Sequence, residues 1–295
     1  MWPLTIGHLR SLCFYDAIGY PPTLPELEMT KDEGVHQSSE VLACIDPSVM
    51  TMQRGRVIFS NRASLLDEHE KRERLFARKI RRARWVTRWL VRLAGVRFVA
   101  LCNTTAWAHA NDEGDLDFFV VVHPGSLWQT RGWAALPFKI LGLRPSTTRV
   151  SDAVCLSFFV DHDHLDLSSL CLPGDDTYFR HWFMSMLPLF DDGIGKTLWV
   201  SNHTLLSRHV SACPWVVHPD VSVRRSFVHL PFFRWLDPLA QAIQKRFLGT
   251  HILEIMNQDT RVVVNDHILK FHVQDGREAI RQAYVERCVR YGIHP

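Results

Sequence analysis

The stretch Gly114-Asp115-Leu116-Asp117-Phe118-Phe119-Val120-Val121-Val122 decides the fold, because two aspartates stand at the head of an uninterrupted apolar run. A run of this length, rich in β-branched and aromatic residues, is typical of a buried strand. Side chains at positions i and i+2 of a strand point to the same side, so Asp115 and Asp117 share one face. A second strand is predicted from Val96 to Cys102, and Asn103-Thr104 follows it directly.

Two carboxylates at the end of a buried strand are costly to ionise unless a positive charge lies between them. Magnesium prefers oxygen ligands and is usually held by one or two carboxylates together with substrate phosphates. Asp115 and Asp117 are therefore the predicted metal ligands, with Mg²⁺ as the expected ion and Mn²⁺ as an alternative. Aspartates also cap turns at strand ends, so an isolated Asp-x-Asp would carry little weight.

The order of these features resembles the core of nucleotidyltransferases of the DNA polymerase β superfamily. There a strand ends in Gly-Ser, a short helix follows, and the next strand opens with Asp-x-Asp. Here Asn103-Thr104 replaces Gly-Ser, which keeps a hydroxyl and loses the glycine. The likeness extends to a bacterial group of nucleotidyltransferase-domain proteins through Phe14-Tyr15-Asp16, Tyr20-Pro21, residues 124–131, Cys155 to Val160, Leu165-Asp166-Leu167 and residues 187–191.

The resemblance implies Mg²⁺-dependent transfer of a nucleoside monophosphate from an NTP, ATP among the candidates, to a hydroxyl acceptor. Asp115 and Asp117 would be the catalytic metal ligands, and Asn103, Thr104 and Thr105 would face the phosphates. Arg131 follows Trp128 by one helical turn at the start of a helix expected from about Ser126 to Leu141. It either contacts the triphosphate or stacks on that tryptophan at the surface.

A third catalytic carboxylate is expected on the next strand, Val154 to Val160, whose interior carries Ser157 and no acid. Asp161 and Asp166, which follow this strand, are the candidates, and Asp166 is taken as the third catalytic residue. The run Asp161-His162-Asp163-His164 contains metal-ligating residue types, but strand alternation would separate its histidines from its aspartates. An exposed polar turn is therefore the preferred interpretation of that run.

The departures from the family pattern favour a second function, that of a catalytically degraded member acting as a nucleic-acid-binding or regulatory module. Its contact would be a long helix expected from Ser64 to Leu93, begun by a capping box of Ser64 and Asp67 and stopped by Gly95. Residues 78–92 of this segment carry seven arginines and lysines, Arg92 included, and no acid. Such a surface attracts phosphates, although charged helix faces are more often simply solvated.

We expect an α/β (α+β) protein whose nucleotidyltransferase-like core has a small mixed sheet flanked by helices. Helices followed by a hairpin predict a winged-helix-like module at the start, with a lid on the core as the alternative. Another hairpin is expected at Arg261 to Val264 and Ile268 to His272, and a last helix from a capping box of Asp275 and Glu278. The expected segments are 1–64 (the module), 65–95 (the basic connecting helix), 96–192 (the core) and 193–295 (a mainly helical region).

Composition indicates the class of protein and its cellular compartment, but it does not indicate a function. With 295 residues, 46% of them hydrophobic and 22% charged, the chain has ordinary globular composition. A net charge of +3 does not by itself require a nucleic-acid partner. Seven scattered cysteines without a Cys-x-x-Cys pair indicate a reducing compartment, and the absence of a long apolar run predicts no membrane partner. These features predict a cytoplasmic protein and leave its oligomeric state open.

Overall fold

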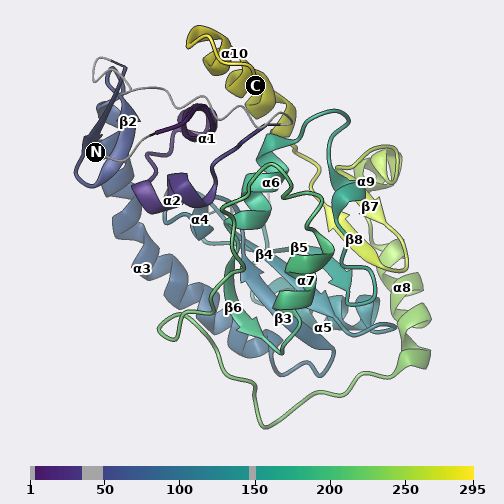
Figure 1. Cartoon of the computed structure of the whole chain (residues 1–295). Coiled ribbons are helices and arrows are strands. Elements are labelled where there is room, and N and C mark those ends of the chain that lie inside the picture. Colours follow the sequence, from purple (N-terminus) through teal and green to yellow (C-terminus); the bar gives the residue numbers. More distant parts are fainter. Residues whose placement is uncertain (1–3, 35–48, 146–150) are drawn as a thin grey trace.

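The computed structural model describes residues 4–34, 49–145 and 151–295 (Figure 1). Its centre is a six-stranded mixed sheet in the order β6-β3-β4-β5-β8-β7. Strands β4 and β5 are parallel, and the other neighbouring strands are antiparallel. The strands are β3 (Val96–Leu101), β4 (Leu116–Val122), β5 (Val154–Asp161), β6 (Leu187–Asp191), β7 (Val262–Val264) and β8 (Ile268–Phe271). The expected α/β class with a mixed sheet flanked by helices is confirmed.

The strands predicted from apolar runs lie within a residue of their expected positions. The β7–β8 hairpin was also predicted, but the structure adds it to the sheet beside β5. The central sheet therefore draws on residues beyond the predicted 96–192 segment. Residues after 192 form helices, the hairpin and a long stretch from Asn202 to Phe233 with no regular helix or strand.

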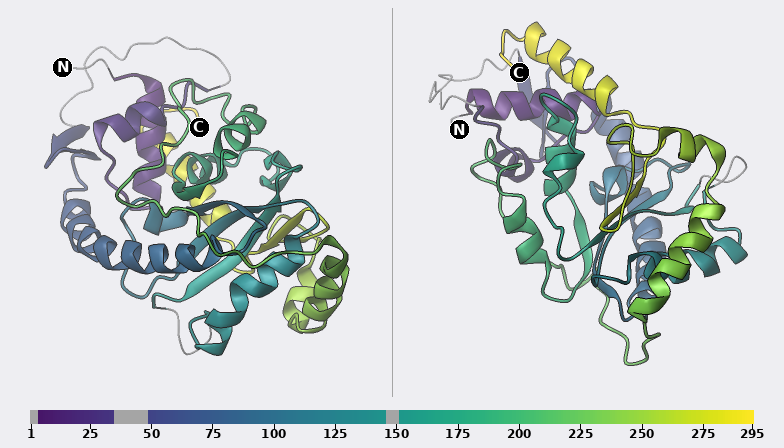
Figure 2. Two further views of the ribbon diagram at one scale, coloured as in Figure 1. Left: turned by 90° about the horizontal axis from the view of Figure 1, so that it is seen from below. Right: turned by 90° about the vertical axis from the view of Figure 1, so that its right-hand side faces the viewer.

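Helices cover both faces of the sheet (Figure 2). On one face, α3 (Ser64–Leu90), α5 (Leu127–Ile140) and α8 (Asp237–Arg246) pack with Val99 and Leu101 of β3. On the other face, α6 (Thr177–Met184) and α7 (Gly195–Ser201) pack with Phe98 and Ala100 of the same strand. The alternation along β3 is what the two-residue period of a strand requires when both faces are buried. Shorter elements are α4 (Asn103–Ala106), α9 (Thr250–Ile255), η1 (Ser168–Leu170) and η2 (Arg234–Leu236).

The N-terminal segment packs against the last helix of the chain. It contains α1 (Ile6–Ala17), α2 (Leu24–Met29) and the hairpin β1 (Met50–Gln53) and β2 (Arg56–Phe59). Its core residues, among them Phe14, lie in one cluster with Tyr284 and Cys288 of α10 (Arg277–Arg290). Figure 1 shows α1 beside α10. The expected helices and hairpin are present, while residues 35–48 lie outside the described part of the chain, so a winged-helix arrangement stays a prediction.

Helix α3 begins at Ser64 as expected, but the two predicted capping boxes are wrong. The N-cap of α3 is Ala63, whose side chain offers no cap, and the Asp67 carboxylate accepts a hydrogen bond from Arg54 at 2.7 Å. Helix α10 begins at Arg277 after Gly276, and the Asp275 carboxylate binds the Arg277 guanidinium and backbone N–H. In both cases a nearby arginine competes for the carboxylate that would have completed the cap.

Helix α3 ends at Leu90, five residues before the glycine that was expected to stop it. Gly95 serves packing instead, because a Cβ atom there would lie 2.5 Å from Thr130 Oγ1 of α5. Each helix among the described residues is too short or too polar to cross a bilayer.

Candidate metal centre

Three side chains converge where β4 begins beside β5. Asp115, Asp117 and Cys155 each offer one ligand atom, and these atoms lie within 4.8 Å of one another. The parallel register pairs Asp117 directly with Cys155. We call these three residues the acidic group. Asp115 and Asp117 lie together as the alternation of the strand predicts.

The surroundings of the acidic group disfavour the ionised forms of its side chains. Burial, followed by the nearby charge of Asp115, raises the pKa of Asp117 to about 6. Burial also raises the pKa of Asp115, and it raises the pKa of the Cys155 thiol well above its usual range. Desolvation and a like charge are the two effects that disfavour an ionised carboxylate. A divalent cation between the two aspartates would reverse both effects.

Asn103 connects the acidic group with the rest of the site. Its Nδ2 donates to Asp117 Oδ2 at 2.6 Å, and its Oδ1 accepts from the Tyr178 hydroxyl at 3.0 Å. Its backbone has a φ of +57°, in the left-handed region. Glycine adopts this conformation without strain, and asparagine tolerates it better than most residues. Asn103 therefore preserves the backbone geometry that a glycine would supply, while adding an amide.

The two threonines of this loop lie differently. Thr104 is exposed, whereas Thr105 is buried in the short helix α4. Of the loop residues predicted to face phosphates, Asn103 and Thr104 are thus accessible, and the Asn103 amide contacts protein groups.

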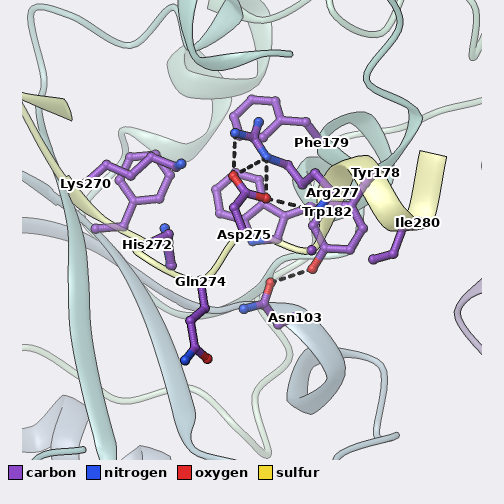
Figure 3. Close-up of a pocket in the computed structure, with 12 residues that line it drawn as sticks. Asn103, Tyr178, Phe179, Trp182, Lys270, His272, Gln274, Asp275, Arg277 and Ile280 are labelled. Carbon is purple, nitrogen blue, oxygen red and sulfur yellow. Dashed lines mark hydrogen bonds and ion pairs between the residues drawn. The ribbon is translucent and has the colours of Figure 1, made fainter. Parts of the chain in front are cut away.

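A pocket of about 220 Å³ opens beside Asn103 (Figure 3). Figure 3 shows Asn103 and Tyr178 on one side of it and Lys270 and His272 on the other. Burial lowers the pKa of Lys270 to about 8, and its ammonium donates to the Thr260 carbonyl. The remaining lining is Phe158, Phe179, Trp182, Gln274, Asp275, Gly276, Arg277 and Ile280. The pocket thus combines aromatic walls with polar groups, and its Asn103 contacts the acidic group.

A chain of polar contacts joins the acidic group to this pocket across the sheet. The Cys155 thiol donates to Ser157 Oγ at 3.2 Å, and Ser157 Oγ lies 3.2 Å from His272 Nε2. Burial lowers the pKa of His272 to about 3, so its imidazole is neutral. Sequence reasoning missed Tyr178, Lys270, His272 and the role of Cys155. A lysine inside the apolar run Ile268 to Phe271 was the one signal that pointed to this wall.

Two arginines lie near the acidic group. Arg131 and Arg144 both interact electrostatically with Cys155, and Arg144 also interacts with Asp115. Arg131 is not stacked on Trp128 at the surface: its guanidinium lies over the Phe271 ring at 4.5 Å and donates to Gln244 at 2.7 Å. Burial lowers the pKa of Arg131 to about 10. Arg144 was not identified from the sequence.

Neither predicted third carboxylate belongs to the acidic group. Asp161 pairs with Val122, at the opposite end of β5 from Cys155. Asp166 is exposed beyond that end, and its carboxylate accepts from the Ser168 N–H at 2.9 Å. The strand neighbour of Asp117 is Cys155, so a thiol occupies the place nearest to the two carboxylates.

The basic surface of α3 divides into two parts. Arg78 binds Asp112 at 2.5 Å and Asp152 at 3.2 Å, and the buried Lys79 also pairs with Asp152. Arg84, Arg88 and Arg92 instead line a groove of about 450 Å³ with Arg224. We call these four residues the arginine groove. The other residues that line it are Val91, Pro219, Ser222, Val223 and Ser226, none of them acidic.

Comparisons of the chain with protein-family models, with curated proteins and with solved structures give no match. The resemblance to nucleotidyltransferases therefore rests on the sequence motifs.

Proposed function

We propose that the chain is a Mg²⁺-dependent nucleotidyltransferase with a nucleotidyltransferase-like core, which transfers a nucleoside monophosphate from an NTP to a hydroxyl acceptor. The convergence of Asp115 and Asp117 beside the Asn103 loop carries this proposal. Oxygen ligands of this kind suit a hard divalent cation. The thiol of Cys155 is a soft ligand, so the two aspartates would hold the ion.

The carboxylates would act by binding and orientation. A bound Mg²⁺ would neutralise charge on the triphosphate and polarise the phosphorus that the hydroxyl attacks. The acceptor hydroxyl would release its proton to water, and its oxygen would form the new bond to the α-phosphorus while the bond to pyrophosphate breaks. Asp117 is suited to this place because its amide contact with Asn103 fixes the carboxylate orientation.

The surroundings of the acidic group support an NTP as the substrate. Arg131 and Arg144 supply positive charge on the side of Cys155. The pocket beyond Asn103 has aromatic walls, on which a nucleobase can stack. The nucleoside would occupy this pocket, and Asn103 and Thr104 would lie between it and the phosphates.

Isothermal titration of MgATP and the other Mg-NTPs tests the proposal. Asp115→Asn and Asp117→Asn should each abolish Mg²⁺-dependent binding, because each removes a charged ligand. Asp166→Asn is the matched control, since its exposed carboxylate lies outside the acidic group. Unchanged affinity in both ligand variants would overturn the assignment of the site.

The arginine groove favours a second candidate function, nucleic-acid binding. Arg84 and Arg88 lie one turn apart on one face of α3, and Arg92 follows just after the helix ends. Arg224 adds a fourth charge from another segment. A groove lined by four arginines and no acid favours a polyanion such as a nucleic acid.

A further inference from the structure

A second cluster of ligand side chains lies at the other end of β5. Asp161 ends that strand, His164 follows in the next loop, and His267 lies in the turn between β7 and β8. Their ligand atoms lie within 4.8 Å of one another. Asp161 Oδ1 is 2.9 Å from His164 Nδ1, and Oδ2 is 2.7 Å from His267 Nδ1. We call these three residues the histidine cluster.

Backbone contacts hold the cluster in place. The Asp161 N–H donates to the His267 carbonyl at 2.9 Å, which ties the hairpin turn to the strand end. The His164 N–H donates to the Asp161 carbonyl at 3.2 Å, and the Asp163 N–H donates to Asp161 Oδ1 at 3.1 Å. The carboxylate is therefore positioned by main-chain geometry and does not depend on the two imidazoles. A site built on such fixed groups loses little entropy when it binds a ligand.

The cluster combines a buried carboxylate with two half-exposed imidazoles. The Asp161 side chain is 3% exposed, whereas those of His164 and His267 are 46% and 45% exposed. The two rings stack with their centroids 3.3 Å apart. Two stacked imidazolium ions would repel each other, so at most one ring can balance the buried carboxylate with a positive charge. One divalent cation would compensate the carboxylate without charging either ring.

The geometry points to a transition-metal site at Asp161, His164 and His267, with Zn²⁺ as the best-suited ion. Imidazole nitrogen and carboxylate oxygen are its usual ligands. The two exposed rings can turn from their stacked position, and each would move its proton from Nδ1 to Nε2 so that Nδ1 becomes the ligand. Three protein ligands leave a fourth tetrahedral position open to water or a substrate group. The ion would also join the hairpin to the loop after β5.

This site is separate from the acidic group. Asp161 lies six residues beyond Cys155 on the same strand, which corresponds to roughly 20 Å. Its ligand set also differs in kind, since imidazole favours Zn²⁺ over Mg²⁺. The proposal therefore stands whether or not the acidic group binds an NTP.

Strand alternation would have separated the histidines from the aspartates in residues 161–164. In the folded chain β5 ends at Asp161 and a turn follows, so this separation does not occur. The turn brings His164 back onto Asp161. The third ligand, His267, comes from a hairpin more than a hundred residues later in the sequence.

Titration of the metal-free protein with ZnCl₂, followed by calorimetry and thermal unfolding, tests the site. Wild-type protein should bind one Zn²⁺ tightly and gain several degrees in melting temperature, by ligand linkage. His164→Ala and His267→Ala should each weaken this binding at least tenfold. His203→Ala is the control, because His203 is exposed on another segment and its imidazole contacts the Val200 carbonyl.

The half-exposed positions of both histidines should allow the variants to fold, which circular dichroism without metal would verify. Loss of tight binding in both variants, with the control unchanged, supports the site. Wild-type affinity in either variant, or no tight binding by wild-type protein, overturns it. Should a variant not fold, Co²⁺ absorption of the wild type decides: a tetrahedral band without thiolate charge transfer supports the site, and its absence contradicts it.

Discussion

Asn103 donates its side-chain amide to Asp117 across 2.6 Å while its own backbone has a φ of +57°. The residue thus does two things at once. It takes the backbone conformation that glycine favours, and it orients the carboxylate that we propose as a metal ligand. These two roles can be separated by substitution.

Asn103→Gly and Asn103→Ala both remove the amide, but only alanine is strained in the left-handed region. We expect Asn103→Ala to be less stable than Asn103→Gly by about 1 kcal/mol. Urea denaturation of the two variants measures the difference. Equal stabilities would mean that the positive φ is not maintained in the folded protein.

The acidic group predicts a pH-dependent stability in the absence of metal. Burial, and then the charge of Asp115, raises the pKa of Asp117 from 3.8 to about 6. The folded state therefore binds the proton more tightly than the unfolded state. This contribution, on the order of 3 kcal/mol, is complete below about pH 4 and is lost as the pH rises through about 6.

Asp117→Asn should flatten the fall in stability between pH 4 and pH 6, as measured by urea denaturation at a series of pH values. Mg²⁺ should stabilise the wild-type protein at pH 7 and have little effect at pH 4.5, where Asp117 is protonated. The same pH slope in variant and wild type would assign the effect to another group.

Cys155 lies beside Asp117 on the strand where the resemblance expects a third carboxylate. We predict that Cys155→Asp binds Mg²⁺ at least tenfold more tightly, because a third hard ligand replaces a soft one. The metal-free variant should be less stable, since three carboxylates then repel one another. Cys155→Ser is the control and should bind Mg²⁺ like the wild type. Weaker binding by Cys155→Asp in calorimetry would show that the thiol does not face the ion.

The contribution of the arginine groove to nucleic-acid binding can be compared with that of other charged residues on α3. Replacing Arg84, Arg88 and Arg92 with glutamine should weaken nucleic-acid binding and reduce the slope of log K against log salt by about 2 to 3. The control replaces three exposed charges elsewhere on α3, Lys71, Arg74 and Arg81. Fluorescence anisotropy with RNA and DNA oligonucleotides measures both variants. Identical salt slopes in the arginine-groove variant and the wild type would show that the arginine groove is an ordinary solvated surface.

Local pattern was sufficient to predict the strands and the convergence of two aspartates. The apolar runs predict strands β3, β4 and β5. The alternation of side chains along a strand places Asp115 and Asp117 together. Position 103 carries asparagine where the resemblance expects a glycine. The structure shows that asparagine keeps the backbone conformation.

Long-range pairing explains what the sequence could not reveal. Lys270 reaches the pocket because β8 pairs with β5, and no local pattern specifies that pairing. Tyr178 contacts Asn103 from a helix 75 residues later in the chain. Helix caps were mispredicted for a related reason, since Arg54 and Arg277 compete for the carboxylates that the motif would use.

Release of labelled pyrophosphate is the most direct test of the central claim. Wild-type protein, Asn103→Ala and Asp117→Asn would each be incubated with Mg²⁺ and every NTP in a cell extract that offers many hydroxyl acceptors. The proposal predicts release by the wild type with at least one NTP, and loss of that release in both variants. Equal release from all three proteins, or none from the wild type with any NTP, would contradict it.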